Sequence, residues 1–407
     1  MWAIPSYTEI ERLVSLAQKY WEKFTYERKT QRFNKAHESF KNPFLSRFLS
    51  WKYSHHNVLN VSGTIYPVVV FPTPKYQERD LESILSKALH RSVHDPEKFV
   101  VVDPHFRALA GELGLPLVNR ITYTMARLNY GGKLQLLCEL GYYYYTLDTC
   151  FSLYWEILSN LDSLVESGQD NFRRFDEELK LRQVLHEVVG DPVTDGSRRS
   201  VAIGISTLIA YNDGKGIKLW VKRRSMQGVA VYPGLVNVLP SGMFQPLVCS
   251  FDEEFSIRHN LYREYLEEIF DRPEVYGEEA YDYFYEDTRL ERLFKLVGRG
   301  QAELFLTGVA VDLLSLRPEI CTLLLIGTPE WFGYHSKAAQ EQERFKLSLE
   351  FMKGSADRGP LEGQVTPIPF SRDDRDLLQY KFLSPFDITP SGAGAFWLGV
   401  NKLREIL

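Results

Sequence analysis

The chain has 407 residues, of which 44% are hydrophobic and 25% are charged, and its formal net charge is -5. These values are typical of a soluble globular protein, and the length predicts two or three domains. The slightly acidic balance excludes a global electrostatic attraction to nucleic acid.

The four cysteines, Cys138, Cys150, Cys249 and Cys321, are scattered without CxxC spacing, and three of them lie in strongly apolar or aromatic runs. This pattern predicts reduced, buried thiols in a cytoplasmic protein. We expect no signal peptide and no membrane span, because no apolar run reaches the roughly eighteen residues that a span needs.

The first sixty residues contain ten lysines and arginines against five glutamates. Apolar residues recur at helical spacing over residues 10–24 and 40–51, which predicts two amphipathic helices. Solvated charges on such helices are favoured over a nucleic-acid-binding arm, because no recognition-helix pattern is present. His55 and His56 have no further ligands nearby in the sequence, so we expect no metal site there.

Residues 61–195 alternate between strand-like and helix-like patterns, which predicts a mixed α/β domain. The expected strands are residues 64–71, 98–102, 122–130 and 133–145, the last two flanking a Gly131-Gly132 turn; the expected helices are residues 80–89, 106–113, 148–164 and 171–189. The run Tyr142 to Tyr145 is expected to end a strand. Its side chains would form either an aromatic interface in the core or one wall of a base-stacking pocket. Turn residues from Gly190 to Ser197 predict a linker, so we divide the chain into domains 1–195 and 196–407.

An acidic cluster stands in the second domain. Glu264, Glu267 and Glu268 follow one another at i, i+3 and i+4, so on a helix they share one face. Their mutual repulsion is tolerated if the face is solvated or if a cation lies there. Oxygen ligands of this kind suit Mg²⁺ or Mn²⁺.

The surrounding pattern resembles the Nudix box, Gly-x5-Glu-x7-Arg-Glu-U-x-Glu-Glu-x-Gly-U, where U is bulky and aliphatic. Arg263 and the three glutamates match its helical half. Upstream lie a strand-like run from Ser200, a turn at residues 212–216, a strand that ends in Lys222-Arg223-Arg224, and the loop Pro240-Ser241-Gly242. The resemblance covers about residues 198–330 and implies a Nudix-like α/β/α sandwich, within an overall α+β fold.

The loop half of the box departs from the family pattern. Gly242 lies seven residues too far from Arg263, Phe255 stands where the first box glutamate belongs, and Phe270 stands at the closing glycine. Glu253 and Glu254 are close enough to replace the missing carboxylate.

The resemblance implies divalent-metal-dependent hydrolysis of a nucleoside diphosphate-linked substrate. It assigns Glu267 and Glu268 as metal ligands, with Glu264 as third ligand or water-activating base. Arg263 would orient an acidic neighbour, and Glu319, from outside the box, is a reserve base. Gly242, Lys222 and Arg223 would lie near the phosphates, with Tyr232 and Phe244 as candidate clamps for the nucleoside.

A second hypothesis stays open: a weak or inactive Nudix-fold nucleotide sensor that signals through residues 1–195. The departures at Phe255 and Phe270 favour this sensor, whereas the intact helical half favours the enzyme. Strands are expected over residues 302–314 and 319–326, a loop over 354–363 and a short helix over 371–378. A final helix follows, capped by Ser391, which packs on the core or mediates a homodimer.

Overall fold

A computed structural model describes residues 29–31, 33–87, 95–115, 117–166, 171–225, 229–247, 251–270, 272, 285–331 and 365–407. The expected helix over residues 10–24 and the expected loop over residues 354–363 lie outside these ranges, as does Cys249.

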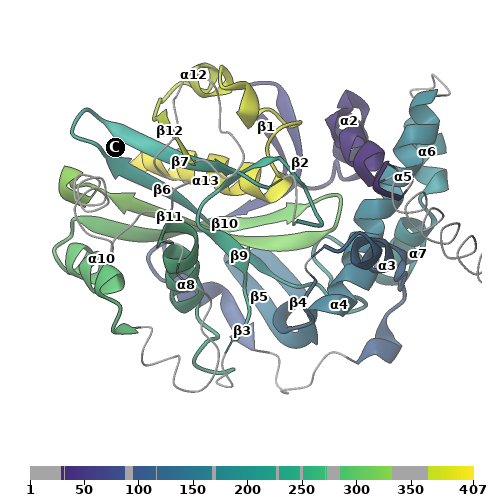
Figure 1. The fold of residues 1–407 in the computed structure, drawn as a ribbon, viewed down its shortest axis with the longest axis horizontal. Coiled ribbons are helices and arrows are strands. Elements are labelled where there is room, and N and C mark those ends of the chain that lie inside the picture. Colours follow the sequence, from purple (N-terminus) through teal and green to yellow (C-terminus); the bar gives the residue numbers. More distant parts are fainter. Residues whose placement is uncertain are drawn as a thin grey trace, which may run out of the picture.

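Within these ranges, the larger of two sheets has nine strands and forms the centre of the molecule (Figure 1). Its main path runs β1 (Val58–Val61), β2 (Thr64–Pro72), β10 (Ala302–Asp312), β11 (Arg317–Ile326), β6 (Gly204–Asn212), β7 (Ile217–Arg223) and β12 (Val365–Pro369), while β8 (Val236–Val238) pairs with β7 and β9 (Ser241–Met243) pairs with β6. Neighbours are antiparallel except β11 and β6, which are parallel. The expected pairing of residues 302–314 with 319–326 is confirmed.

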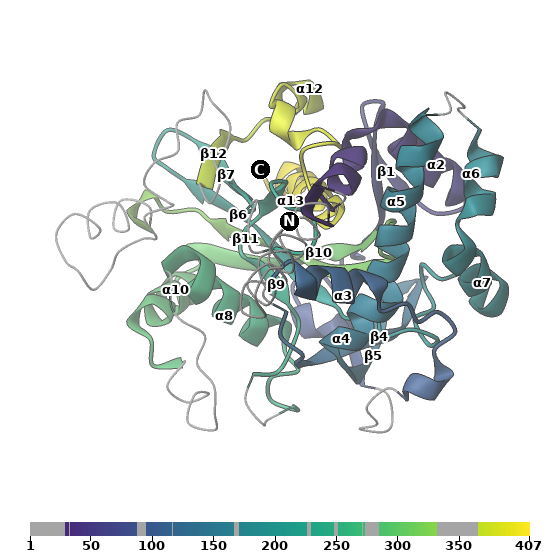
Figure 2. The same ribbon diagram turned by 45° about the vertical axis from the view of Figure 1, so that its right-hand side comes forward.

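Helices cover both faces of this sheet (Figures 1 and 2). The long helix α13 (Pro390–Ile406) packs on one face, while α8 (Ile257–Phe270) and α10 (Thr288–Gly298) lie against the other. A separate buried apolar cluster fills each interface. The α+β class expected from the sequence is confirmed.

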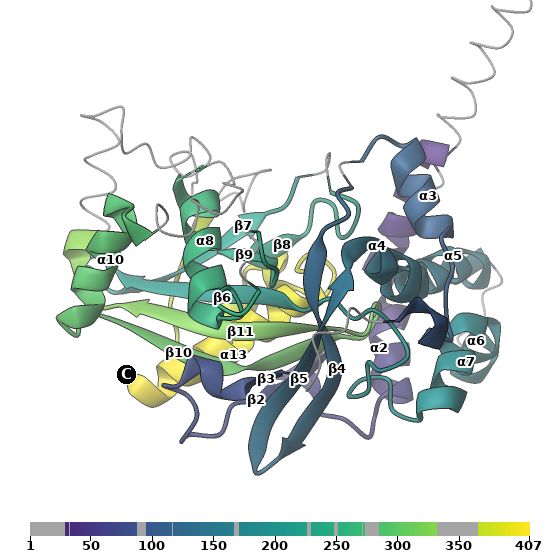
Figure 3. The same ribbon diagram turned by 90° about the horizontal axis from the view of Figure 1, so that it is seen from below.

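A three-stranded sheet and a group of helices come from the first half of the chain (Figure 3). The strands are β3 (Leu85–Lys87), β5 (Lys133–Tyr142) and β4 (Ile121–Gly131), in that spatial order. The helical elements are η1 (Ser39–Lys41), α2 (Pro43–Lys52), η2 (Leu81–Ile84), η3 (Pro96–Lys98), α3 (His105–Glu112), α4 (Tyr143–Thr146), the π-helical turn η4 (Leu147–Phe151), α5 (Ser152–Glu166), α6 (Phe172–Glu178) and α7 (Lys180–Val189). Near the end of the chain lie α12 (Asp374–Leu378) and η7 (Lys381–Leu383).

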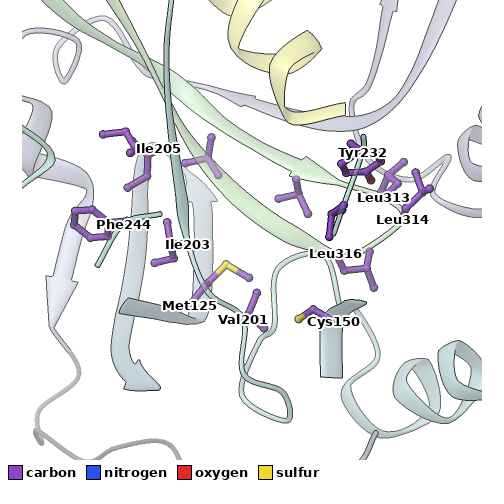
Figure 4. Packing of buried hydrophobic residues seen from close by; sticks show 14 of the residues in the cluster. Met125, Cys150, Val201, Ile203, Ile205, Tyr232, Phe244, Leu313, Leu314 and Leu316 are labelled. Atoms are coloured by element: carbon purple, nitrogen blue, oxygen red, sulfur yellow. The ribbon is translucent and has the colours of Figure 1, made fainter. Parts of the chain in front are cut away.

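The two sheets share a continuous core. Residues 195–203 run along β4 before they enter β6, and the amide of Met125 donates to the carbonyl of Val201 at 2.8 Å. Figure 4 shows Met125, Val201, Ile203 and Phe244 packed at this junction. Strands β1 and β2 belong to the large sheet, with β2 paired to β10, so that sheet takes strands from both sides of the boundary placed at residue 195.

Buried Arg182 of α7 also holds the two halves together. Its guanidinium donates to the hydroxyl of Tyr53 at 2.7 Å and to the carbonyls of Leu313 and Leu314 in the β10–β11 turn at 3.0 and 2.5 Å. Because a buried guanidinium without partners is costly, these bonds fix α7 against that turn.

Two local predictions are wrong. The segment predicted as a helix from residue 80 instead forms η2 and then β3, because Leu85–Lys87 pairs with β5 of the small sheet. The strand expected over residues 98–102 is not formed in that described segment, which follows the short turn η3 and contacts Arg198 through one backbone bond from Val100.

Three further boundaries differ. The tyrosine run leaves the strand at Tyr142, and residues 143–146 are helical. The helix expected over residues 171–189 breaks at Leu179 into α6 and α7. Thr389, rather than Ser391, caps α13, since its side chain accepts from the amide of Gly392 at 3.0 Å.

Cys138, Cys150 and Cys321 are free and buried, as expected. No helix in the described ranges combines the length and apolar character needed to cross a membrane.

Close contact between α13 and the sheet requires a small residue at Gly394. A Cβ there would lie 2.4 Å from the Cβ of Ala310 on β10. We expect Gly394→Ala to lower the free energy of unfolding by about 1–3 kcal/mol in denaturant titrations, because a packed interface cannot absorb the added carbon. Gly111→Ala on α3, where a Cβ meets nothing within 4 Å, is the matched control and should be neutral or slightly stabilising. Equal effects of the two changes would contradict this packing.

Candidate functional site

The expected acidic helix is α8, and residues from the first half of the chain fix its start. The carboxylate of Glu82 accepts from the amides of Ile257 and Arg258 at 2.8 and 3.1 Å and from the hydroxyl of Ser256 at 3.0 Å. A carboxylate at this end satisfies amides that have no partner within the helix and favours the helix dipole.

Arg263 ties the middle of α8 to the strand β9 and the loop after it. Its buried guanidinium donates to the carbonyls of Gln245 and Met243 at 2.8 and 2.9 Å, and to the Oε1 atom of Glu264 at 2.8 Å. Its Nε atom lies 3.8 Å from a carboxylate oxygen of Glu267. Arg263 is therefore a positioning residue that holds the acidic face of α8 beside β9 (Figure 1).

Gly242 is needed where α8 approaches β9. A Cβ at this position would lie 2.1 Å from the carboxyl carbon of Glu264, so any side chain would displace that carboxylate. One turn further along α8, Glu268 accepts from the amide of Ser241 at 2.7 Å. The two carboxylates thus flank the backbone of β9.

Burial raises the pKa of Glu268 from 4.5 to about 7, and the charge of Glu264 adds to this shift. The Nζ atom of Lys222, 4.0 Å from Glu268, and the guanidinium of Arg224 oppose it. Glu268 therefore carries a carboxyl group that titrates near neutral pH and is exposed to 24%.

A cavity of about 330 Å³ lies along the backbone of β9. Its charged side chains are Arg224, Arg317, Asp312 and Glu319, and its polar ones include Tyr232 and Ser391. Leu117, Tyr143 and Phe151 from the first half of the chain complete the wall. A ligand in this cavity would therefore contact both halves of the molecule.

Two arginines give the cavity its positive charge. The Nε atom of Arg317 donates to the carbonyl of Ala202 at 3.0 Å, and its guanidinium lies 5.1 Å from the ring centre of Phe151. Arg224 lines the cavity, and its charge lowers the pKa of both Glu268 and Glu319, so it lies near both carboxylates. Fixed guanidinium groups at such a place suit a phosphate-bearing ligand.

Glu319 lies in the cavity wall on β11, with its carboxylate packed against Gly204 of β6. It accepts from the hydroxyl of Ser206 at 2.5 Å. Burial raises its pKa, while Arg317 and Arg224 act against that shift. The parallel pairing of β11 with β6 is what brings Ser206 and Glu319 together.

Of the residues expected at the site, Gly242, Tyr232 and Glu319 line the cavity, whereas Arg263, Lys222 and the α8 carboxylates lie outside its lining. Tyr232 lines the cavity, and its hydroxyl donates to Asp312 at 2.7 Å. Lys222 faces Glu268. Arg223 points elsewhere and donates to the carbonyl of Gly234 at 2.5 Å. Phe244 is fully buried and packs against Tyr123 and Phe255, so it does not line the cavity.

Sequence reasoning missed Arg317 as a site residue and did not choose Arg224 over its neighbours. A signal for Arg224 was available, because strand neighbours alternate and Lys222 and Arg224 share a side. Arg317 is the first residue of β11 and precedes the mostly apolar run from Ile320 to Ile326, which marks it as a charge at the start of a buried strand but does not indicate what it faces.

The α8 carboxylates fit a hard cation by chemistry, but they do not form a closed cage. Their oxygens do not all lie within 4.8 Å of one another; among the described residues only His55, His56 and Asp191 meet that condition as a trio. Mg²⁺ needs no such cage, since it commonly takes one or two carboxylates, keeps several waters and completes its shell with substrate phosphates. Glu267 and Glu268, exposed to 23% and 24%, suit that mode.

Comparison with known proteins returned no family: no protein-family model matches the chain, and a search of curated proteins found no match.

The raised pKa of Glu268 predicts a pH-dependent cost to stability. A group whose pKa is higher in the folded state than in the unfolded state stabilises the folded state fully below its unfolded pKa, here about pH 4.5. This contribution is lost as the pH rises through the folded pKa of about 7. We therefore expect Glu268→Gln to be more stable than the parent protein at pH 8, by about 1–2 kcal/mol after allowing for partial exposure, and the difference to shrink by pH 5. Denaturant titrations with a chelator present measure this.

The matched control is Glu291→Gln on α10, whose exposed carboxylate pairs with neighbouring Lys295. A Glu268→Gln stability difference that stays constant from pH 5 to pH 8 would contradict the shifted titration.

Proposed function

We propose that the protein hydrolyses the diphosphate linkage of a nucleotide derivative, with Mg²⁺ or Mn²⁺, where α8 meets β9, and that it belongs to the Nudix superfamily. One observation carries the proposal: the backbone of Ser241–Met243 has the α8 carboxylates against it and also walls a cavity with two arginines. A diphosphate with its counter-cations needs both kinds of group side by side.

Each set of residues has a distinct role in this proposal. Arg224 and Arg317 bind phosphate oxygens in the cavity. Lys222 partly neutralises the negative charge of Glu268. Glu267 and Glu268 hold the cation, with Glu264 as the third carboxylate of the set. When bound, the cation neutralises the diphosphate and so lowers the barrier to attack by water.

Glu319 is better placed than Glu264 to accept a proton from that water. The carboxylate of Glu264 is bound by the Arg263 guanidinium and does not line the cavity. That of Glu319, although it packs on Gly204, belongs to the cavity wall and accepts from the neutral hydroxyl of Ser206. A base must reach the water that it activates, so we assign Glu319 as the base and Glu264 as a carboxylate that positions the helix face.

The nucleotide sensor stays as the second candidate, and a specific observation favours it. Leu117, Tyr143 and Phe151 of the first half share the cavity with Arg317 and Glu319 of the second half. A bound ligand would therefore contact both halves and could shift the conformation of either one, as a sensor requires. The buried free thiols support a reducing, cytoplasmic setting for either function, and α13 is buried over most of its length, which supports packing on the core.

We expect Mg²⁺-dependent release of phosphate products from at least one of NAD, ADP-ribose, dinucleoside polyphosphates, nucleoside triphosphates or cyclic oligonucleotides. Glu267→Gln should lower kcat/KM on the order of 100-fold, because the cation loses a ligand. Chromatography of the products measures this, with Glu291→Gln as the control.

Turnover by Glu267→Gln at the parental rate would refute the assigned site. If no substrate is cleaved and a nucleotide still raises the melting temperature, the sensor is the correct function.

A further inference from the structure

A second group of ligand-type side chains lies away from α8 and the cavity. His55 and His56 come from the turn between α2 and β1, and Asp191 comes from the turn after α7. One ligand atom from each of the three lies within 4.8 Å of the other two. His56 and Asp191 are 135 residues apart in the sequence, so only the fold brings the histidines and the aspartate together.

Two members of this trio are already oriented. Asp191 accepts from the amide of Val193 at 3.1 Å and from the hydroxyl of Thr194 at 2.5 Å, and the Nε2 atom of His56 lies 2.9 Å from its Oδ1 atom. The backbone amide of His56 donates to the carbonyl of Tyr53 at 2.9 Å. The contacts from Val193, Thr194 and Tyr53 come from outside the trio, and outer contacts of this kind hold metal ligands in place and raise metal affinity.

An ion pair between His56 and Asp191 accounts for only part of this arrangement. That pair needs one imidazole, yet the ring of His55 lies with its centre 4.3 Å from that of His56, and its nitrogen also reaches the group. Two imidazoles and a carboxylate at this spacing form a donor set for a borderline metal ion rather than for Mg²⁺ or Ca²⁺, which prefer oxygen ligands.

We propose that His55, His56 and Asp191 bind one divalent transition-metal ion, with Zn²⁺ as the ion of first choice. Three protein ligands leave a fourth tetrahedral position for water, and the exposure of His55 gives the ion access. The site is separate from the cavity and does not depend on the proposed hydrolysis.

The bound ion would act as a clip between two segments that are distant in the sequence. The turn that carries His55 and His56 also carries Tyr53, whose hydroxyl meets Arg182 at 2.7 Å and His186 of α7 at 3.1 Å. A metal at Asp191 would join the same turn to the segment after α7. Because the unfolded chain keeps these ligands apart, the metal should stabilise the folded state.

The test is a Zn²⁺ titration of the full chain, free of any histidine tag and stripped of metal with a chelator. Calorimetry should show one saturable equivalent with a Kd of about 10 μM or tighter. The melting temperature should rise with Zn²⁺ concentration and fall back when chelator is added.

His55→Gln and Asp191→Asn should each weaken this binding at least about tenfold. His105→Gln, which changes an exposed histidine on α3, should leave it unchanged. Glu267→Gln should still bind one equivalent of Zn²⁺. That result would show that this site is distinct from the α8 carboxylates.

Absence of saturable binding at 100 μM Zn²⁺ would overturn the proposal, as would unchanged affinity in His55→Gln. His55 lies on an exposed turn, so we expect that variant to retain the fold even if the change at Asp191 disturbs it.

Discussion

The contact between the Glu264 carboxylate and the backbone of Gly242 is the constraint on which the candidate site depends. Arg263 holds Glu264 there by bonding both it and the carbonyls of Met243 and Gln245. The same approach lets Glu268 reach the amide of Ser241. A larger residue at 242 would separate the helix from β9, and the acidic face would then no longer lie beside the cavity.

The site belongs to the whole molecule rather than to one half. Glu82 from the first half caps α8, and Tyr143 and Phe151 line the cavity. Arg182 binds the β10–β11 turn and so holds α7 against it. Strand β2, also from the first half, pairs with β10 and extends the large sheet. Those contacts place side chains from both halves around one charged cavity, and they give residues before 195 a direct physical link to any bound ligand.

Sequence patterns predicted the parts of the fold that local periodicity determines, and little else. The acidic face of α8, the strand pairs β4–β5 and β10–β11, and α13 follow from local sequence patterns. The partner of each strand does not, because pairing such as that of β11 with β6 joins residues more than 100 positions apart. For this reason Leu85–Lys87, a strand only because β5 lies beside it, was expected to be helical. Likewise, Phe244 was expected in the site because it lies close to Gly242 in the sequence. Its position in the chain cannot show that its side chain fills the core instead.

Diffraction from a crystal grown with Mn²⁺ and methylenediphosphonate, which cannot be hydrolysed, tests the central claim most directly. The account predicts an anomalous Mn²⁺ peak at Glu267 and Glu268, with diphosphonate density that extends from it to Arg224 and Arg317. Diphosphonate bound far from the cavity, or a cavity left without ligand while Mn²⁺ lies elsewhere, would contradict the claim that the α8 carboxylates and the arginine cavity form one site.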